Sequence, residues 1–222
     1  MRKLKFLIAF IFILGFISCN KQQQTNLEKE VDTATTKVRK ELDTLISSIK
    51  SGDTIFNNVK ITQVDTAKLS SPELRESINN IFSYYIDIKN ELADNDSVDS
   101  RSKAKEMMSV VLTSIEKIGP KNIDKKWKFS SEKVEKAAAE IEAAGTLEKQ
   151  RILFDKLSKS VLEAIQQYGL EDKTIYQLSC SDALSGKGGT WLSDSKNSDN
   201  PYLGENASNK NCAKVVAAWK FN

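Results

Sequence analysis

The chain contains no histidine, and it has only three cysteines and three prolines among its 222 residues. Histidine is the side chain best suited to proton transfer near neutral pH, and it is also a common metal ligand. Its absence excludes Ser/His and Cys/His nucleophile pairs and histidine-based zinc or copper sites. A phosphate-binding loop is also missing, because the run from Gly186 to Gly189 lacks the spacing and the following helix that such loops need. The sequence therefore predicts a protein that is not an enzyme.

An excess of positive charge is missing once the first residues are set aside. The opening segment consists of three basic residues, an apolar run and a small residue before a cysteine: Arg2, Lys3, Lys5, Phe6 to Ile17, Ser18 and Cys19. This run is too short to span a bilayer and is typical of a secretory signal. Without its three basic residues, 30 of the 33 remain, and they balance the 30 acidic residues. We therefore expect no nucleic acid among the partners.

The end of this segment resembles a lipoprotein box. In such a box, the cysteine thiol is acylated and becomes the mature N-terminus, as Cys19 would here. The usual leucine three residues earlier is Phe16, a variation seen in lipoproteins of the Bacteroidota. We therefore expect a signal peptide over residues 1–19, lipidation of Cys19, and a protein anchored to the membrane of the cell envelope and facing the periplasm.

Apolar residues recur at helical spacing through most of the remaining chain. Residues 20–69 are expected to form a polar tether, a helix from Leu27 to Ile49 and a short extended segment near Val59 and Ile61. Ser71 and Pro72 are suited to cap and begin the first helix of the main domain, and Gly169 is suited to end its fourth. We therefore expect a mainly α fold, with an antiparallel four-helix bundle and a C-terminal irregular or short-strand cap over residues 70–216. An extra N-terminal helix is expected to precede the bundle, and residues 217–222 are expected to form a tail.

Several other residues have both a structural and a functional explanation. Met107 and Met108 lie at helical core spacing, and Trp127, Trp191 and Trp219 are explained by packing more readily than by a binding surface. A set of Asp-Ser/Thr-aliphatic triplets resembles the O-glycosylation triplet of Bacteroidota envelope proteins, although helix caps and chance also explain it. The triplets begin at Asp32, Asp43, Asp53, Asp65 and Asp96.

Two cysteines remain after Cys19 is assigned to lipid, and they enclose a segment rich in Gly, Asn and Ser. In an oxidising compartment, Cys180 and Cys212 are expected to form a disulfide. That bond would close a loop of about 33 residues and stabilise the domain by roughly 3 to 4 kcal/mol. As thiolates, the same pair could instead hold Cu(I) or Zn(II), with Asp182 as a third ligand. Both interpretations require the two sulfur atoms to lie together, whereas two separate free thiols, the third alternative, do not.

A set of motifs resembles domain of unknown function 3347, found in Bacteroidota envelope lipoproteins and fused to some copper-efflux adaptors. They are Ser83 to Leu92, Lys149 to Arg151 with Phe154, Leu157 and Ser158, Tyr176 to Cys180, Lys187 to Ser193, Asn200 to Gly204 and Cys212. The resemblance extends over about residues 70–214. It implies a periplasmic helical domain that binds or senses copper or a related soft metal.

This chain departs from the family in its ligand-type residues. Relatives read Cys-Pro-Met where this chain has Cys180 to Asp182, and they carry histidines at the positions of Lys149 and Leu153. They also have a methionine shortly before the last cysteine, whereas none occurs from Glu205 to Asn211. Our leading hypothesis is a domain without enzymatic activity that has lost most of this ligand set. The alternatives are a working Cu(I) or Zn(II) handling protein, and an envelope scaffold that binds a protein partner through the helix from Leu27 to Ile49. The partner could be an envelope protein or an efflux system.

Overall fold

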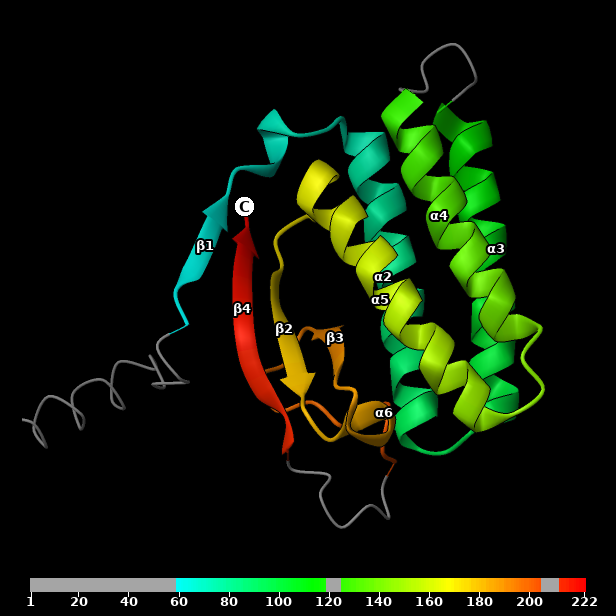
Figure 1. Cartoon of the computed structure of the whole chain (residues 1–222). Helices are drawn as coiled ribbons and strands as arrows, with labels where there is room; N and C mark the ends of the chain where they lie inside the picture. The colour runs from blue at the N-terminus through cyan, green and yellow to red at the C-terminus, as the bar shows by residue number, and fades with distance from the viewer. Residues whose placement is uncertain (1–58, 119–124, 205–211) are drawn as a thin grey trace, which may run out of the picture. The chain divides into compact units, whose positions relative to one another are not determined.

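The computed structural model describes residues 59–118, 125–204 and 212–222. All of them belong to one compact unit, Phe56–Asn222. Within these ranges the protein is mainly helical, with a small mixed sheet built largely from the C-terminal region (Figure 1). The predicted signal peptide, Cys19 and the helix expected from Leu27 to Ile49 lie outside the described residues.

The structure describes four long helices, and the first and last of them begin at residues that cap helix N-termini. Ser71 caps the first of them, because its Oγ accepts a hydrogen bond from the backbone N of Leu74 at 3.4 Å, and Pro72 occupies the first helical position, as predicted. Thr146 caps the last in the same way, through the backbone N of Lys149. The helices are α2 (Pro72–Ala93), α3 (Ser97–Ile118), α4 (Lys125–Glu142) and α5 (Leu147–Tyr168).

These helices pack in a cycle around one apolar core. Each contacts its neighbour along the chain, and α5 also contacts α2. Met107 and Trp127 are almost fully buried in this core, so the packing interpretation holds for both of them. Other large buried residues include Ile78, Ile81, Tyr85, Ile88, Leu92, Ile141, Phe154 and Leu157.

The end of α5 holds the segment that precedes α2. Gly169 has a positive φ of 77°, as a glycine cap requires, but its ψ of 175° differs from the left-handed helical value. A Cβ at this position would lie 2.5 Å from Cγ2 of Thr66, which belongs to the short 3-10 turn η1 (Thr66–Lys68). Thr66 Oγ1 also donates a hydrogen bond to the carbonyl O of Leu170 at 2.8 Å. Glycine is therefore required here for close approach as well as for backbone conformation.

The sheet has four strands in the order β1-β4-β2-β3. The segment expected to be extended near Ile61 forms the edge strand β1, which runs parallel to β4, while the other pairs are antiparallel. The elements are β1 (Ile61–Val64), β2 (Thr174–Cys180), α6 (Ala183–Gly186), β3 (Gly189–Ser193) and β4 (Lys214–Phe221).

The C-terminal region contains short strands, which the predicted irregular or short-strand cap included, and residues 217–221 belong to one of these strands rather than to a tail. β4 pairs with β1 on one side and with β2 on the other. The buried residues of β4 are Val215, Ala218 and Phe221, each three positions from the next, and a register shift between Gln177 and Leu178 accounts for the first of these two spacings. A search for period-two alternation therefore misses this strand.

Candidate functional site

The two cysteines of the C-terminal region form a disulfide. Cys180 is the last residue of β2 and Cys212 lies just before β4, and their α carbons are 5.2 Å apart. Cys180 is 1% exposed, whereas Cys212 is half-buried and its Sγ accepts a hydrogen bond from Asn200 Nδ2 at 3.3 Å. The prediction that the two sulfur atoms lie together is confirmed, and the bond joins the ends of two neighbouring strands.

The third predicted ligand, Asp182, lies two residues after Cys180, at the start of α6. Its side chain is exposed, and its Oδ1 accepts a hydrogen bond from Ser181 Oγ at 3.0 Å. A disulfide carries no thiolate, and thiolates are the form of cysteine that binds soft metals. Cys180, Cys212 and Asp182 could therefore hold a metal only after the disulfide is reduced.

The Gly-rich and Asn-Pro motifs around this bond serve packing. A Cβ at Gly189 would lie 2.7 and 2.8 Å from two ring carbons of Tyr202. The Tyr202 hydroxyl donates to the carbonyl O of Thr190 at 2.5 Å, and its backbone N donates to Oδ1 of Asn200 at 2.9 Å. The buried Trp191 ring makes an edge contact with Tyr202 at 5.9 Å between ring centroids. These residues pack on one another within the segment that the two cysteines enclose.

Lys89 is a buried charged residue that we did not predict from the sequence. It is 4% exposed, and its Nζ donates a hydrogen bond at 3.0 Å to Oγ of Ser198, which also accepts one from Trp191 Nε1 at 3.3 Å. Burial lowers the pKa of Lys89, while the charges of Asp199 and two other aspartates oppose this shift. The signal was available in the sequence, since Lys89 is four residues after Tyr85 on the apolar face of α2.

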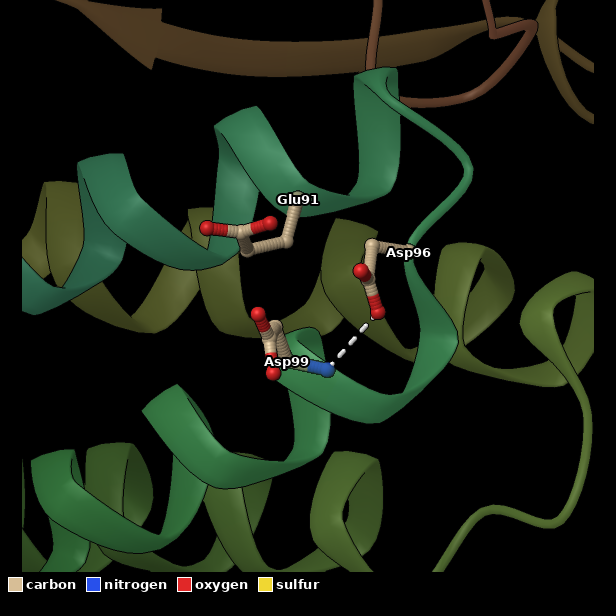
Figure 2. A group of neighbouring side chains, drawn as sticks. All are labelled: Glu91, Asp96 and Asp99. Atoms are coloured by element: carbon tan, nitrogen blue, oxygen red, sulfur yellow. Dashed lines mark hydrogen bonds between the residues drawn. The ribbon is translucent and has the colours of Figure 1, made fainter.

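Three carboxylates gather where α2 ends and α3 begins, on Glu91, Asp96 and Asp99 (Figure 2). One oxygen of each lies within 4.8 Å of the others, and oxygen ligands of this kind suit hard cations. Asp96 already has a structural role, because its Oδ1 accepts hydrogen bonds from the backbone N of Val98 at 3.0 Å and of Asp99 at 2.9 Å. Burial, together with neighbouring aspartate charges, raises the pKa of Glu91. We therefore assign Asp96 to capping of α3.

Comparison with known proteins identifies the helical part of the chain. Residues 81–173 match the family "Protein of unknown function (DUF3347)". The resemblance predicted from the motifs is therefore confirmed over this segment. No curated protein and no solved structure gives a match.

The DUF3347 segment begins inside α2 and ends just before β2, so it is shorter than the predicted range of 70–214. Cys180, Asp182 and Cys212 all lie beyond it. The two positions at which the resemblance implies histidine, Lys149 and Leu153, lie within it on α5, where Lys149 is exposed and Leu153 is half-buried. The match thus identifies the helical part and leaves the disulfide region unassigned.

Two polar side chains of the DUF3347 segment connect the helices to the C-terminal region. The buried Tyr85 hydroxyl accepts a hydrogen bond from the backbone N of Leu192 at 2.9 Å and is bonded to Ser158 Oγ at 2.8 Å. Burial raises the pKa of this phenol, so it remains neutral.

Arg151 makes the second connection. Its guanidinium donates to the carbonyl O of Pro201 at 2.9 Å, to that of Leu92 at 2.7 Å and to Asn95 Oδ1 at 2.9 Å. It therefore joins α5, the end of α2 and the Asn-Pro motif.

Two of the predicted glycosylation triplets fall within the described residues. In the first, Thr66 is 1% exposed and its hydroxyl is bonded to Leu170, so that oxygen is not accessible for glycosylation in the folded protein. In the second, Asp96 is a helix cap and Ser97 Oγ accepts a hydrogen bond from Gln150 Nε2 at 2.9 Å. Structural explanations hold for both. The other three triplets lie outside the described residues, and among those described no helix is long and apolar enough to cross a bilayer.

Proposed function

We propose that the protein is a lipid-anchored envelope protein facing the periplasm, and that its DUF3347 helices form an antiparallel four-helix bundle with a binding or scaffolding role and no enzymatic activity. The secretory signal and the lipoprotein box ending at Cys19 support the location. The lack of histidine supports a role other than catalysis. The polar contacts of Tyr85 and Arg151 support a domain in which bundle and sheet act as one body.

The disulfide between Cys180 and Cys212 is the observation that carries this proposal. Such bonds persist in oxidising compartments and are rare in the cytosol. Cys180 is almost fully buried, and a buried sulfur is poorly accessible to an attacking thiolate. The bond is therefore suited to a permanent structural role, linking the middle strands β2 and β4 near one end of the sheet.

A soft-metal protein is the rival function, with Cys180, Cys212 and Asp182 as ligands for Cu(I) or Zn(II). Its support is the same proximity of the sulfurs, since two-electron reduction would leave two thiols with α carbons about 5 Å apart. Two thiolates and one exposed carboxylate are a smaller ligand set than structural zinc sites use. The family resemblance supports this alternative, because it implies a domain that binds or senses copper or a related soft metal.

Thiol labelling of the whole protein, purified from envelopes without reductant, distinguishes the two functions. We expect Cys180 and Cys212 to react only after reductant is added, and metal analysis to find less than about one ion per ten chains. The variant Cys180→Ser is the matched control, because it should expose one reactive thiol at Cys212 without reductant. Thiols released by a chelator alone, together with one equivalent of metal, would favour the soft-metal protein.

The location is tested separately. The N-terminal peptide of the mature protein should begin with an acylated Cys19, and Cys19→Ala should move the protein from the membrane fraction to the soluble fraction. A membrane-bound Cys19→Ala protein would contradict the lipid anchor.

A further inference from the structure

A groove of about 290 Å³ lies between α2 and α3, in the half of the bundle away from the carboxylates of Figure 2. Its walls come from both helices and combine polar side chains with the apolar surfaces of Tyr84 and Val110. Residues that contribute to the groove include Glu76, Asn80 and Tyr84 on α2, and Glu106, Ser109 and Thr113 on α3. A volume of this size is at the lower end of the range for small-molecule sites in proteins.

The hydroxyl groups of the groove can accept hydrogen bonds from a ligand. Ser109 Oγ donates its proton to the carbonyl O of Lys105 at 3.3 Å, and Thr113 Oγ1 donates to that of Ser109 at 2.8 Å. Ser77 Oγ, which also lines the groove, donates to the carbonyl O of Glu73 at 3.0 Å. A hydroxyl has one proton and two lone pairs, so each of these oxygens can still accept a hydrogen bond. The groove therefore suits a ligand that is rich in donors.

The charged groups of the groove are already paired. Glu76 forms an ion pair with Lys117 at 2.7 Å, and Glu106 forms one with Lys103 at 3.3 Å. A charged ligand would have to compete with these lysines or lie beside them without a partner of its own. A neutral ligand can accept or donate hydrogen bonds at the pairs without disturbing them, so the charge distribution favours a neutral ligand.

Two side chains of the groove have no hydrogen-bond partner among the described residues. In the described part of the chain, neither the Asn80 amide nor the Tyr84 hydroxyl has a hydrogen bond, although both line the groove. The amide supplies two donors and an acceptor, and the phenol supplies one donor. The half-buried ring of Tyr84 adds an apolar surface on which C–H groups can pack.

We propose that this groove binds a neutral polyhydroxylated ligand, namely an uncharged sugar or one sugar unit of a glycan. The O–H groups of a sugar are the donors that the Ser, Thr and Glu oxygens need. Its ring oxygen and hydroxyl lone pairs match the donors of Asn80 and Tyr84, and its C–H face can pack on the tyrosine ring. This inference is independent of the lipid anchor and of the state of the disulfide.

Ligand-observed saturation-transfer NMR tests the proposal on the whole protein, kept in a detergent without a sugar head group. The probes are the methyl glycosides of glucose, galactose and N-acetylglucosamine, and the charged sugars glucuronate and glucosamine serve as comparisons. We expect at least one neutral glycoside to bind with a Kd below about 10 mM, and the charged sugars to bind more weakly.

Substitutions locate the binding. Ser109→Trp should fill the groove and abolish binding, whereas Ser102→Trp, at an exposed position of the same helix outside the groove, should leave it unchanged. Asn80→Ala should weaken binding roughly 3- to 10-fold, the value of one or two hydrogen bonds, and Asn90→Ala, at an exposed position of α2, should not. Circular dichroism checks that each variant keeps its helices.

Three results would overturn the proposal: no neutral glycoside binds up to about 10 mM, a charged sugar binds as well as its neutral counterpart, or Ser109→Trp and Ser102→Trp behave alike.

Discussion

The helical part of the molecule and its sheet are held together by different means. The helices α2 to α5 follow one another directly in the sequence, and each packs on its chain neighbours. The sheet joins β1 to β4, from opposite ends of the described chain, and its two middle strands are linked near one end by a disulfide. Local patterns and short connections specify the first region, whereas long-range pairing and a covalent bond specify the second. Single substitutions in the sheet should therefore lower the free energy of unfolding more than single substitutions in the helices do.

Loss of the disulfide should have the largest effect. Cys212→Ser should lower the free energy of unfolding by roughly 3 to 4 kcal/mol, because the unfolded chain regains the freedom of a loop closed over a sequence separation of 32. Denaturant unfolding followed by circular dichroism measures the change. Reductant added to the wild-type protein is the control and should produce the same loss, whereas a wild-type protein insensitive to reductant would show that the bond is not stabilising.

A methyl group at Gly189 tests the packing around that bond. Gly189→Ala should destabilise the protein by up to about 3 kcal/mol, since the new Cβ would meet the ring of Tyr202 and, at 3.0 Å, Cβ of Ala183. Gly145→Ala, in the turn between two helices, is the matched control, because its Cβ would meet nothing within 4 Å. Equal stabilities for the two variants, measured by thermal unfolding, would refute the close packing of the sheet region.

The difference between local and long-range contacts also decides how much of each region could be predicted from the sequence. The cap at Ser71, the proline at the start of α2 and the core position of Met107 were readable, because helix signals lie within a few residues of one another. The cysteine pair was also readable, from the number of cysteines and from the compartment that the signal segment predicts. β4 was not, because its buried residues lie three positions apart instead of alternating, and only the first of these spacings follows from the register shift opposite Gln177. The partner of Lys89, Ser198, lies on a distant loop that no local pattern connects to α2.

The hydroxyl of Tyr85 tests the connection between the two regions. Tyr85→Phe should cost roughly 1 to 2 kcal/mol of unfolding free energy, because it leaves the buried backbone N–H of Leu192 without its acceptor. Tyr84→Phe, one position earlier and half-buried, is the matched control and should change stability by less than about 0.5 kcal/mol. Chemical denaturation provides the comparison, and similar losses for both variants would contradict a specific bond between helix and sheet.

The smallest expected effect concerns the pH dependence of stability at Lys89. Because burial lowers its pKa in the folded protein, the unfolded chain binds this proton more tightly, and the free energy of unfolding should rise with pH between the lowered pKa and the ordinary value of 10.5. Lys89→Met should remove this rise, whereas Lys105→Met, at an exposed position of α3, should retain it. Urea unfolding at pH 8 and pH 10 measures both, and an unchanged rise in Lys89→Met would exclude this lysine as its source.

The central claim is that the disulfide stabilises the sheet, whereas the helices are stabilised by packing on one another. Backbone amide hydrogen exchange tests this claim most directly, measured on the wild-type protein with and without reductant. The amides of β2 and β4 should lose protection when the bond between Cys180 and Cys212 is reduced, and those in the core of α2 and α5 should keep most of theirs. Equal loss of protection in both regions, or none in either, would contradict the account.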